Sequence, residues 1–470
     1  MHTALCCVYR FFRAYEEESI NMANQQVCDM TVGNETSLLL KFSIPMLVGN
    51  IFQQFYNMVD SIVVGNYVGK NALAAVGMTS SLTFLFFCLC NGFATGAGVL
   101  MSQYFGMKNE KRVKDVIGNS VYLLLGMGII VSILSVAFAG PILKLLHTPD
   151  AIFADALLYT QIVCGGVMAV VMYNGIAAML RALGDSRTPL IFLVISSILN
   201  VAGDLLLVLV FHMGVAGVAI ATIVAQACSA ILCILYSVRK NPYFRLTRES
   251  FRPDPYILKK TIRLGIPFGA QGSLISISCI ALQSVINQFG EDVIAAFTAT
   301  CRIEQLVQQP YNSLGMAVAT FTGQNLGAGK IDRVKKGYHR SALIVVVFSV
   351  LMCVMMYLWG NDFVRLFVDD ANVVAIGGRG VRITSLFYIP LGMIYVARNL
   401  MNGSGDSVFA FISGLAEVAG RVGFSVILAA IPALGYWAVW YTSGLTWLIT
   451  GIVCMLRYAQ GKWKRIALVR

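Results

Sequence analysis

The stretch from Ile44 to Gly69, IPMLVGNIFQQFYNMVDSIVVGNYVG, decides the fold because it is long and apolar enough to cross a bilayer. Its polar residues recur at spacings of three and four, so on a helix they share one face: Asn50, Gln53, Asn57 and Asp60. A charge at bilayer depth costs about 2.5–3.5 kcal/mol, so it usually faces protein or water and has a function. We therefore expect a membrane helix, bendable near Pro45, with a titratable group toward its far end.

The composition places the whole chain in the membrane. Hydrophobic residues make up 57% of the 470 residues and charged residues only 12%, against about 25% charged residues in a typical soluble domain. Apolar runs of spanning length recur about twelve times between residues 41 and 458. We therefore expect an all-α polytopic membrane protein with about twelve transmembrane helices. The net charge of +12 does not indicate a nucleic-acid partner, because the basic residues cluster in alternate loops.

A polar linker divides the expected spans into two sets of six. The spans cover residues 41–64, 73–104, 117–139, 157–182, 188–211 and 214–238, then 262–289, 293–325, 340–359, 381–403, 407–431 and 435–457. These limits define a leader (1–37), an amino-terminal lobe (38–240), a linker (241–260), a carboxy-terminal lobe (261–458) and a basic tail (459–470). We expect the leader to be loose, and translation could start at Met1, Met22 or Met30.

Basic residues mark every second connection. They follow the second, fourth and eighth spans, fill the linker and recur on the tail, whereas the intervening connections hold little beyond Lys70, Lys144 and Arg365. Because cytoplasmic loops carry the excess of Lys and Arg, we expect the leader, the linker and the tail to be cytoplasmic. We expect a multi-pass protein of the plasma membrane that contacts lipid and acts as a monomer.

The two halves are repeats in a constant register. An offset of 221 residues carries Gln103 onto Gln324, Gly106 onto Gly327, and Gly184-Asp185-Ser186 onto Gly405-Asp406-Ser407. Such a constant offset is hard to obtain by chance. Each unit has an even number of spans, so both units enter the membrane from the same side. The repeats should therefore be parallel, with a cavity between the lobes.

Several motifs follow one another along the chain in an order that is specific when taken together. They are the span from Pro45 to Asp60, the segment VGNYVGKNALAAVG after it, LRALGDSRTP followed by ILNVAGDLLL, and the two Q-x-x-G elements at Gln103 and Gln324. In this order they resemble the multidrug and toxic compound extrusion (MATE) transporters of the bacterial type, over about residues 38–458. The resemblance implies two six-helix lobes and antiport of small cationic drugs against H⁺ or Na⁺.

The resemblance also implies a cation-coupling site in the amino lobe, which would take a proton or Na⁺. The family's aspartate in the first helix matches Asp60, its N-x-x-x-D pair in the fifth matches Asn200 and Asp204, and its threonine in the sixth matches Thr222. No cofactor beyond the coupling ion is expected. Some members carry further carboxylates in the carboxy lobe, but residues 264–290 and 384–404 contain no Asp or Glu. A second site of that kind is therefore doubtful.

The depths of Asp60 and Asp204 agree with a shared site. At 1.5 Å per residue, Asp60 lies about 29 Å along its helix from Lys41, and Asp204 about 24 Å along from Thr188. Two nearby carboxylates in a low dielectric cannot easily both stay ionised. Such a pair would take up a proton or hold Na⁺ through hard oxygen ligands. The plainer alternative is that each aspartate caps a helix end or hydrogen-bonds a neighbour.

Other polar and aromatic residues have less specific patterns. Candidates to line an apolar cavity for flat cations, each equally explained by packing, are Gln53, Tyr56, Asn57, Met172, Tyr173 and Asn174. In the carboxy lobe, Glu417 and Arg421 are four residues apart and should neutralise each other. Asp185 and Asp406 lie in Gly-rich turns and are expected to be caps or loop residues.

Two alternative functions compete with export. A membrane enzyme has little support, because the four histidines lie in loops or at helix ends and no H-E-x-x-H or G-x-S-x-G motif occurs. A flippase for lipid-linked glycans or other amphiphiles is the stronger alternative, since related twelve-helix folds do that work. Basic residues in a wide groove would favour anionic headgroups, whereas the acidic pair favours cationic cargo. We therefore predict a secondary active exporter of small cations, not an enzyme.

Overall fold

The computed structural model describes residues 28–145 and 148–466, which form helices and no strand. The helices of the amino-terminal half are α2 (Glu35–Val63), η1 (Val64–Val68), α3 (Lys70–Gly106), α4 (Glu110–Leu145), α5 (Asp150–Gly165), α6 (Val167–Ala182), α7 (Arg187–Leu205), η2 (Leu206–Val210) and α8 (Gly214–Lys240). Those of the carboxy-terminal half are α9 (Pro255–Ile286), η5 (Asn287–Phe289), α10 (Glu291–Gly327), α11 (Ile331–Arg365), α12 (Ala371–Ser385), α13 (Tyr388–Ser404), α14 (Ser407–Ala429), η6 (Gly435–Trp437), α15 (Ala438–Gln460) and η7 (Lys462–Arg465). The linker contains η3 (Pro242–Phe244) and η4 (Arg248–Phe251).

These helices account for the predicted membrane spans. Among the described residues, eight helices are long and apolar enough to cross a membrane, and two bent pairs, α5 with α6 (45°) and α12 with α13 (52°), would each make one more span. Helices α2 and α10 have spanning length, 29 and 37 residues, but carry more polar side chains. The prediction of an all-α fold with about twelve spans in two lobes is confirmed.

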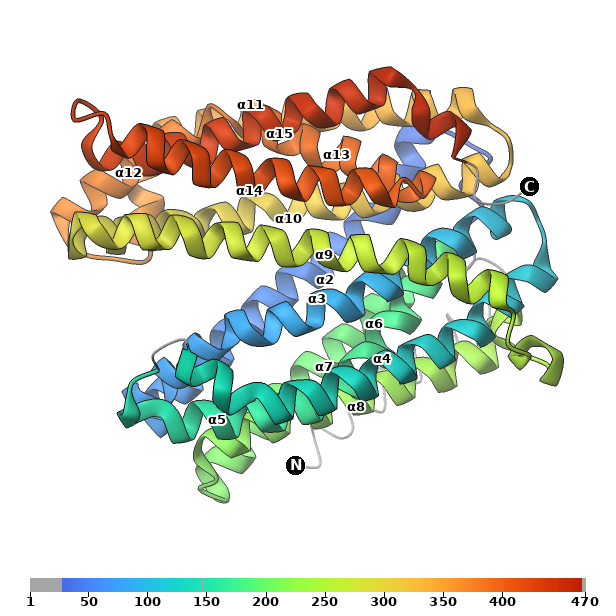
Figure 1. Cartoon of the computed structure of the whole chain (residues 1–470), viewed down its shortest axis with the longest axis horizontal. Helices are drawn as coiled ribbons and strands as arrows, with labels where there is room; N and C mark the ends of the chain where they lie inside the picture. The colour runs from blue at the N-terminus through green and yellow to red at the C-terminus, as the bar shows by residue number, and fades with distance from the viewer. Residues whose placement is uncertain (1–27, 146–147, 467–470) are drawn as a thin grey trace, which may run out of the picture.

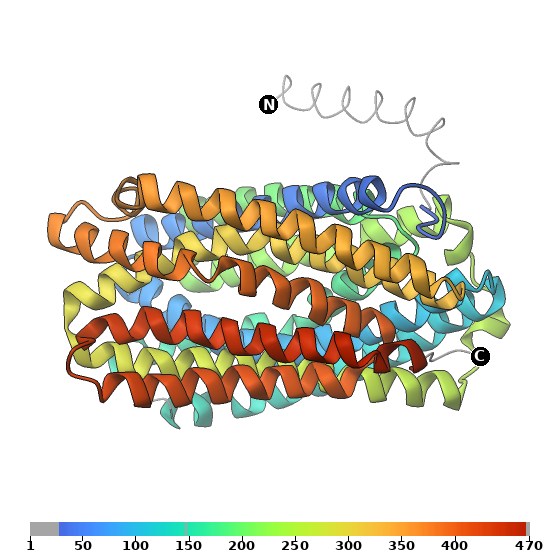
Figure 2. The same ribbon diagram turned by 90° about the horizontal axis from the view of Figure 1, so that it is seen from above.

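The helices run roughly along the long axis of the molecule and form two bundles (Figures 1 and 2). We call the end at which the linker joins the halves the linker end, and the opposite end the far end. The bundles meet at the linker end and splay apart toward the far end (Figure 1). The first helix of each half lies between the bundles: α2 packs on α7 of its own half and α10 of the other, and α9 packs on α14 and α3.

Small residues permit the close crossing of α3 and α9. A Cβ atom added at Gly92 would lie 2.4 Å from the carbonyl oxygen of Gly265 and 2.4 Å from the backbone nitrogen of Gly269. No side chain fits at that distance, so the two backbones are in direct contact. Such small-residue contacts are a common way for membrane helices to approach each other.

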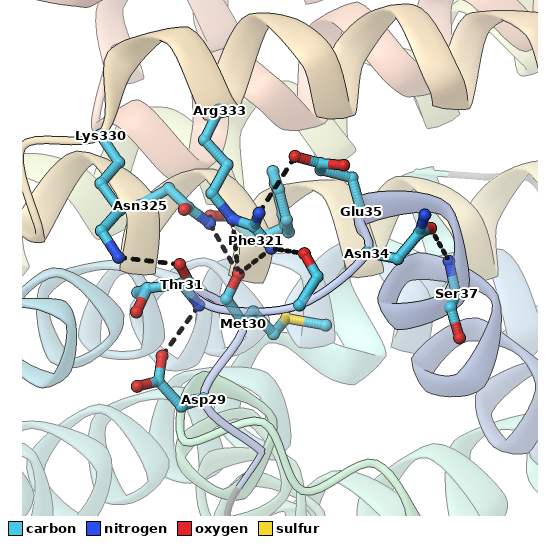
Figure 3. A network of polar contacts seen from close by, with 11 residues as sticks. Asp29, Met30, Thr31, Asn34, Glu35, Ser37, Phe321, Asn325, Lys330 and Arg333 are labelled. Carbon is cyan, nitrogen blue, oxygen red and sulfur yellow. Dashed lines mark hydrogen bonds and ion pairs between the residues drawn. The ribbon is translucent and has the colours of Figure 1, made fainter.

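The end of the leader differs from the sequence prediction. Residues 1–27 lie outside the described residues, but Cys28–Asn34 is packed against the linker end instead of being loose (Figure 3). Met30 is fully buried there. Helix α2 then starts at Glu35, before the predicted span at 41, because the Asn34 side chain caps it by accepting a hydrogen bond from the Ser37 backbone N–H at 3.1 Å.

Candidate cation site

Both helices that carry the predicted aspartates end in a π-helical turn. Asp60 lies on α2 four residues before η1, and Asp204 lies on α7 two residues before η2. The two π turns contact each other. A π turn widens the helix and frees backbone groups from the regular ladder, and such turns are frequent at functional sites. The pairing of two π turns therefore fixes the ends of α2 and α7 next to each other.

This arrangement brings the two carboxylates together. The side chains of Asp60 and Asp204 lie within hydrogen-bonding range of each other, on the neighbouring helices α2 and α7. Asp204 is fully buried and Asp60 is half-buried. Apart from their mutual contact, Oδ1 of Asp60 and both oxygens of Asp204 have no hydrogen-bond partner among the described residues. Two facing carboxylates of this kind need a proton or a metal cation between them.

Asn200 and Thr222 extend the same polar cluster. The Asn200 side-chain N–H group donates to Oγ1 of Thr222 at 3.2 Å, and that hydroxyl donates to the Val218 carbonyl at 3.0 Å. Asn200 is buried, and its Oδ1 has no donor within the described part of the chain. The side-chain amide of Asn200 is thus held by Thr222 of α8, while its Oδ1 atom accepts no hydrogen bond among the described residues. That oxygen lies one helical turn from Asp204 on the same face of α7.

Apolar side chains pack beside this cluster. Valines from α2, η1, η2, α5 and α8 pack together with Tyr159 in one core: Val63, Val64, Val163, Val208, Val215 and Val218. An apolar environment strengthens the electrostatic interactions beside it and makes an unpaired carboxylate costly. A cation placed between the two carboxylates would therefore interact with them more strongly than it would in water.

The oxygen atoms present suit either H⁺ or Na⁺. Within residues 28–145 and 148–466, no group of three or more His, Cys, Asp or Glu side chains could hold a metal ion. A Na⁺ ion would instead need the two carboxylates together with amide and hydroxyl oxygens from Asn200 and Thr222. Hard oxygen donors of this kind bind hard cations. A proton would need only the two facing carboxylates.

The predicted cavity residues divide into two groups. Tyr56 is hydrogen-bonded to Gln53 and lies within electrostatic range of Asp60 and Asp204. Asn57 is exposed, and Met172 and Asn174 are half-buried. Tyr173, in contrast, is buried in the amino-lobe core, where its hydroxyl donates to the Pro189 carbonyl at 2.8 Å. Its assignment to a cavity is therefore corrected: Tyr173 joins α6 to α7.

The carboxy lobe holds arginine at the corresponding place. Arg421, register-equivalent to Asn200, bonds Glu417 at 3.4 Å, and Arg398 bonds the same carboxylate at 2.9 Å. Arg421 also donates to the Ser278 hydroxyl at 2.9 Å. The predicted pairing of Glu417 with Arg421 is confirmed, and Arg398 joins it. A guanidinium thus occupies the region where the amino lobe has an unpaired amide oxygen.

The turn aspartates behave as predicted. Oδ1 of Asp185 accepts from the backbone N–H groups of Arg187 at 3.1 Å and Thr188 at 3.0 Å. Oδ1 of Asp406 accepts from the Phe409 N–H group, while Oδ2 pairs with Arg457 at 2.7 Å. Burial raises the pKa of Asp185, and the hydrogen bonds that it accepts oppose this effect. Both residues cap helices at the linker end.

Sequence reasoning missed two parts of the site. Tyr159 on α5 is buried in the apolar core beside the site and lies within electrostatic range of Asp60 and Asp204. Its only signal was a tyrosine next to a threonine in an apolar span, a pattern that packing explains equally well. The π turns were also missed, because a π turn has no distinct hydrophobic period and follows from the packing of α2 against α7.

Comparison with known proteins identifies the fold and the family. The MatE family model matches residues 45–206 and 267–427. The chain is 29% identical over 443 residues to the probable multidrug resistance protein YpnP of Bacillus subtilis (strain 168), covering 94% of this chain and 98% of that protein. It is 23% identical to the probable multidrug resistance protein NorM of Thermotoga maritima, covering 92% and 94%. A solved outward-facing multidrug resistance MATE transporter superposes with a TM-score of 0.88 at 22% identity, over 94% of this chain and 98% of that one. The chain therefore belongs to the MATE family of multidrug efflux transporters.

Proposed function

We propose that this protein exports small cationic amphipathic compounds by antiport against H⁺ or Na⁺, with Asp60 and Asp204 as the coupling pair. One observation carries the proposal: two carboxylates face each other beside an apolar core, with no donor among the described residues to neutralise them. Asn200 and Thr222 would supply further oxygens if the ion is Na⁺.

Competition for negative charge would link the ion to the drug. A cationic compound is held most strongly while the carboxylate pair carries net negative charge. Entry of H⁺ or Na⁺ from outside neutralises the pair and weakens that attraction, so the drug leaves. An inward H⁺ gradient supplies free energy from the pH difference plus about 2.3 kcal/mol per charge per 100 mV of membrane potential, enough to drive uphill export.

The flippase alternative has less support in the arrangement of charges. An anionic lipid headgroup would need basic side chains that are free to bind it. The buried arginines of the carboxy lobe, Arg398 and Arg421, are both bonded to Glu417. The acidic pair of the amino lobe has no such internal counter-charge among the described residues. This asymmetry favours cationic cargo.

We further propose that the linker end is cytoplasmic and that the protein acts as a monomer in the plasma membrane. The alternating basic charge supports this orientation, because the arginines and lysines of the linker and of the α3–α4 and α10–α11 connections lie at one end. The carboxylate pair lies toward the far end, which would then face the outside. A coupling ion would reach it from there.

Ethidium transport into inverted membrane vesicles tests the proposal. The vesicles are given an acidic interior in one experiment and a Na⁺-loaded interior in another. We expect ethidium to accumulate under one of these gradients, and that gradient identifies the coupling ion. Asp60→Asn should abolish accumulation, because asparagine keeps the shape of the side chain but cannot cycle a charge. Asp362→Asn, at an exposed aspartate paired with Arg365, is the matched control and should transport normally. Full transport by a well-inserted Asp60→Asn variant would rule out the role assigned to Asp60.

A further inference from the structure

Two register-equivalent glutamines join the halves at the linker end. Nε2 of Gln103 on α3 donates to the carbonyls of Gly403 and Ser404 at 3.2 Å each, at the end of α13. Nε2 of Gln324 on α10 donates to the Ala182 carbonyl at 2.9 Å, at the end of α6. Gly403 and Ala182 are themselves 221 residues apart. Each half therefore makes the same hydrogen bond to the other half.

The glycines of the Q-x-x-G elements permit this contact. A Cβ atom added at Gly106 would lie 1.9 Å from the Gln324 carbonyl oxygen, and one added at Gly327 would lie 2.0 Å from that of Gln103. Helices α3 and α10 therefore touch backbone to backbone at the point where the glutamines cross. Both glutamine side chains are buried, at 1% and 0% exposure.

Register-equivalent arginines hold the segments that lead into α2 and α9. Arg112, at the start of α4, bonds Asp254, the residue that caps α9, at 2.6 Å. Arg333, at the start of α11, bonds Glu35, the first residue of α2, at 3.0 Å. Each arginine thus holds the first helix of the other half. The two ion pairs are therefore equivalent, as expected for two repeats.

The segment Cys28–Gly33, which we call the strap, lies across the same junction (Figure 3). The Met30 backbone N–H donates to Oε1 of Gln324 at 2.8 Å, and its carbonyl accepts from Nδ2 of Asn325 at 3.1 Å. Lys330 donates to the Thr31 carbonyl at 2.9 Å. In the other half, the backbone of Cys28 fills the place of a side chain at Gly184, where a Cβ atom would lie 2.1 Å from the Cys28 oxygen. The strap therefore contacts both lobes.

We propose that the paired glutamines and the strap form a latch that keeps the linker end closed, and that the latch must break for the transporter to open on that side. The acceptors of both glutamine amides are carbonyls at helix ends, which water can satisfy once the lobes separate. A cleft of about 380 Å³ lies at the junction and is lined by Thr31, Val32, Gly106, Met107, Lys108, Gly327, Ala328 and Lys330. The latch concerns the conformational cycle and holds whichever ion drives transport.

Electron–electron distance measurements on the full-length protein in lipid nanodiscs test the latch. Spin labels at Lys111→Cys and Asp332→Cys report the separation of the lobes at the linker end, because these exposed residues are register-equivalent and start α4 and α11. The labels are placed on a background in which the twelve native cysteines are replaced. The distance distribution is then compared between the latch-intact protein and the variants below.

The double variant Gln103→Ala/Gln324→Ala should raise the population with the longer distance about tenfold, since it loses the hydrogen bonds of two buried amides. Arg333 lies at the edge of the junction, and Arg333→Gln removes its bonds to Glu35 and to the Gly33 carbonyl of the strap. This variant should raise the population with the longer distance by a smaller factor. Gln283→Ala removes an exposed amide near the end of α9 that donates to the adjacent Asn287 of η5, away from the linker end, and should change nothing. Unchanged distances in both latch variants would overturn the proposal, as would an equal change in Gln283→Ala. If the double variant fails to insert, Arg333→Gln decides the matter by the same criterion.

Discussion

At the scale of single residues, Asp204 and Glu417 show how differently the two lobes treat a buried carboxylate. Both side chains lie in the interior of their lobe, at 0% and 6% exposure. Glu417 is neutralised by Arg398 and Arg421, whereas Asp204 faces a second carboxylate. A buried charge neutralised by an internal partner is typical of a structural role, whereas a buried ionisable group without an opposite charge is a candidate functional site. Coupling should therefore depend on Asp204 and not on Glu417.

Asp204→Asn should abolish ion-coupled efflux with little loss of folded protein. Glu417→Gln should instead lower stability by about 3–5 kcal/mol, because two buried guanidinium groups lose their counter-charge, but should leave coupling intact in the protein that folds. Ethidium efflux per folded transporter, measured for both variants alongside the amount that survives gel filtration, separates these effects. If both variants fold equally well and only Glu417→Gln loses coupling, the coupling site lies in the carboxy lobe.

At the scale of elements, the sequence predicted the spans better than the contacts between them. Apolar length and the 221-residue register identify the helices, and polar residues inside apolar spans draw attention to Asp60 and Asp204. The burial of Met30 and the packing of the strap could not be predicted, because a short polar leader has no periodicity and its partners are about 300 residues away. The π turns also depend on tertiary packing.

The backbone contact between α3 and α10 gives a stability prediction. Gly106→Ala should destabilise the protein by about 1–3 kcal/mol, because the new methyl group overlaps the Gln324 carbonyl and the helices must shift. Gly126→Ala, within α4 where a Cβ meets nothing within 4 Å, should be neutral or stabilising by up to about 1 kcal/mol. Thermal unfolding in detergent compares the two. Equal midpoints would show that the helices do not meet closely at Gly106.

At the scale of the whole molecule, the two halves make equivalent contacts at the linker end but differ at the cation site. The linker-end glutamines, glycines and arginines all recur at the same offset and make equivalent contacts. The cation site does not recur: the positions equivalent to Asp60 and Asp204 are Leu282 and Ser425, neither of which can ionise. The halves therefore share the contacts at the linker end, while only the amino lobe carries the carboxylate pair proposed to bind the coupling ion.

Cysteine labelling in intact cells tests the orientation of this frame. A cysteine at Glu249 in the linker should be protected from an impermeant maleimide, because we place the linker end in the cytoplasm. A cysteine at Asp369, exposed between α11 and α12 at the far end, should be modified and serves as the matched control. Both are introduced on a cysteine-free background. Modification of the linker cysteine from outside would reverse the orientation and, with it, the side from which the coupling ion enters.

The most direct test of the central claim is the binding of ethidium to the purified transporter, titrated at several pH values and Na⁺ concentrations. If Asp60 and Asp204 exchange a drug for a coupling ion, the affinity of the natural protein should fall as either H⁺ or Na⁺ rises. In Asp60→Asn the affinity should lose most of that dependence, while the protein stays folded and Asp362→Asn keeps the full dependence. An unchanged ion dependence in folded Asp60→Asn would contradict the claim that this carboxylate pair couples ion entry to drug release.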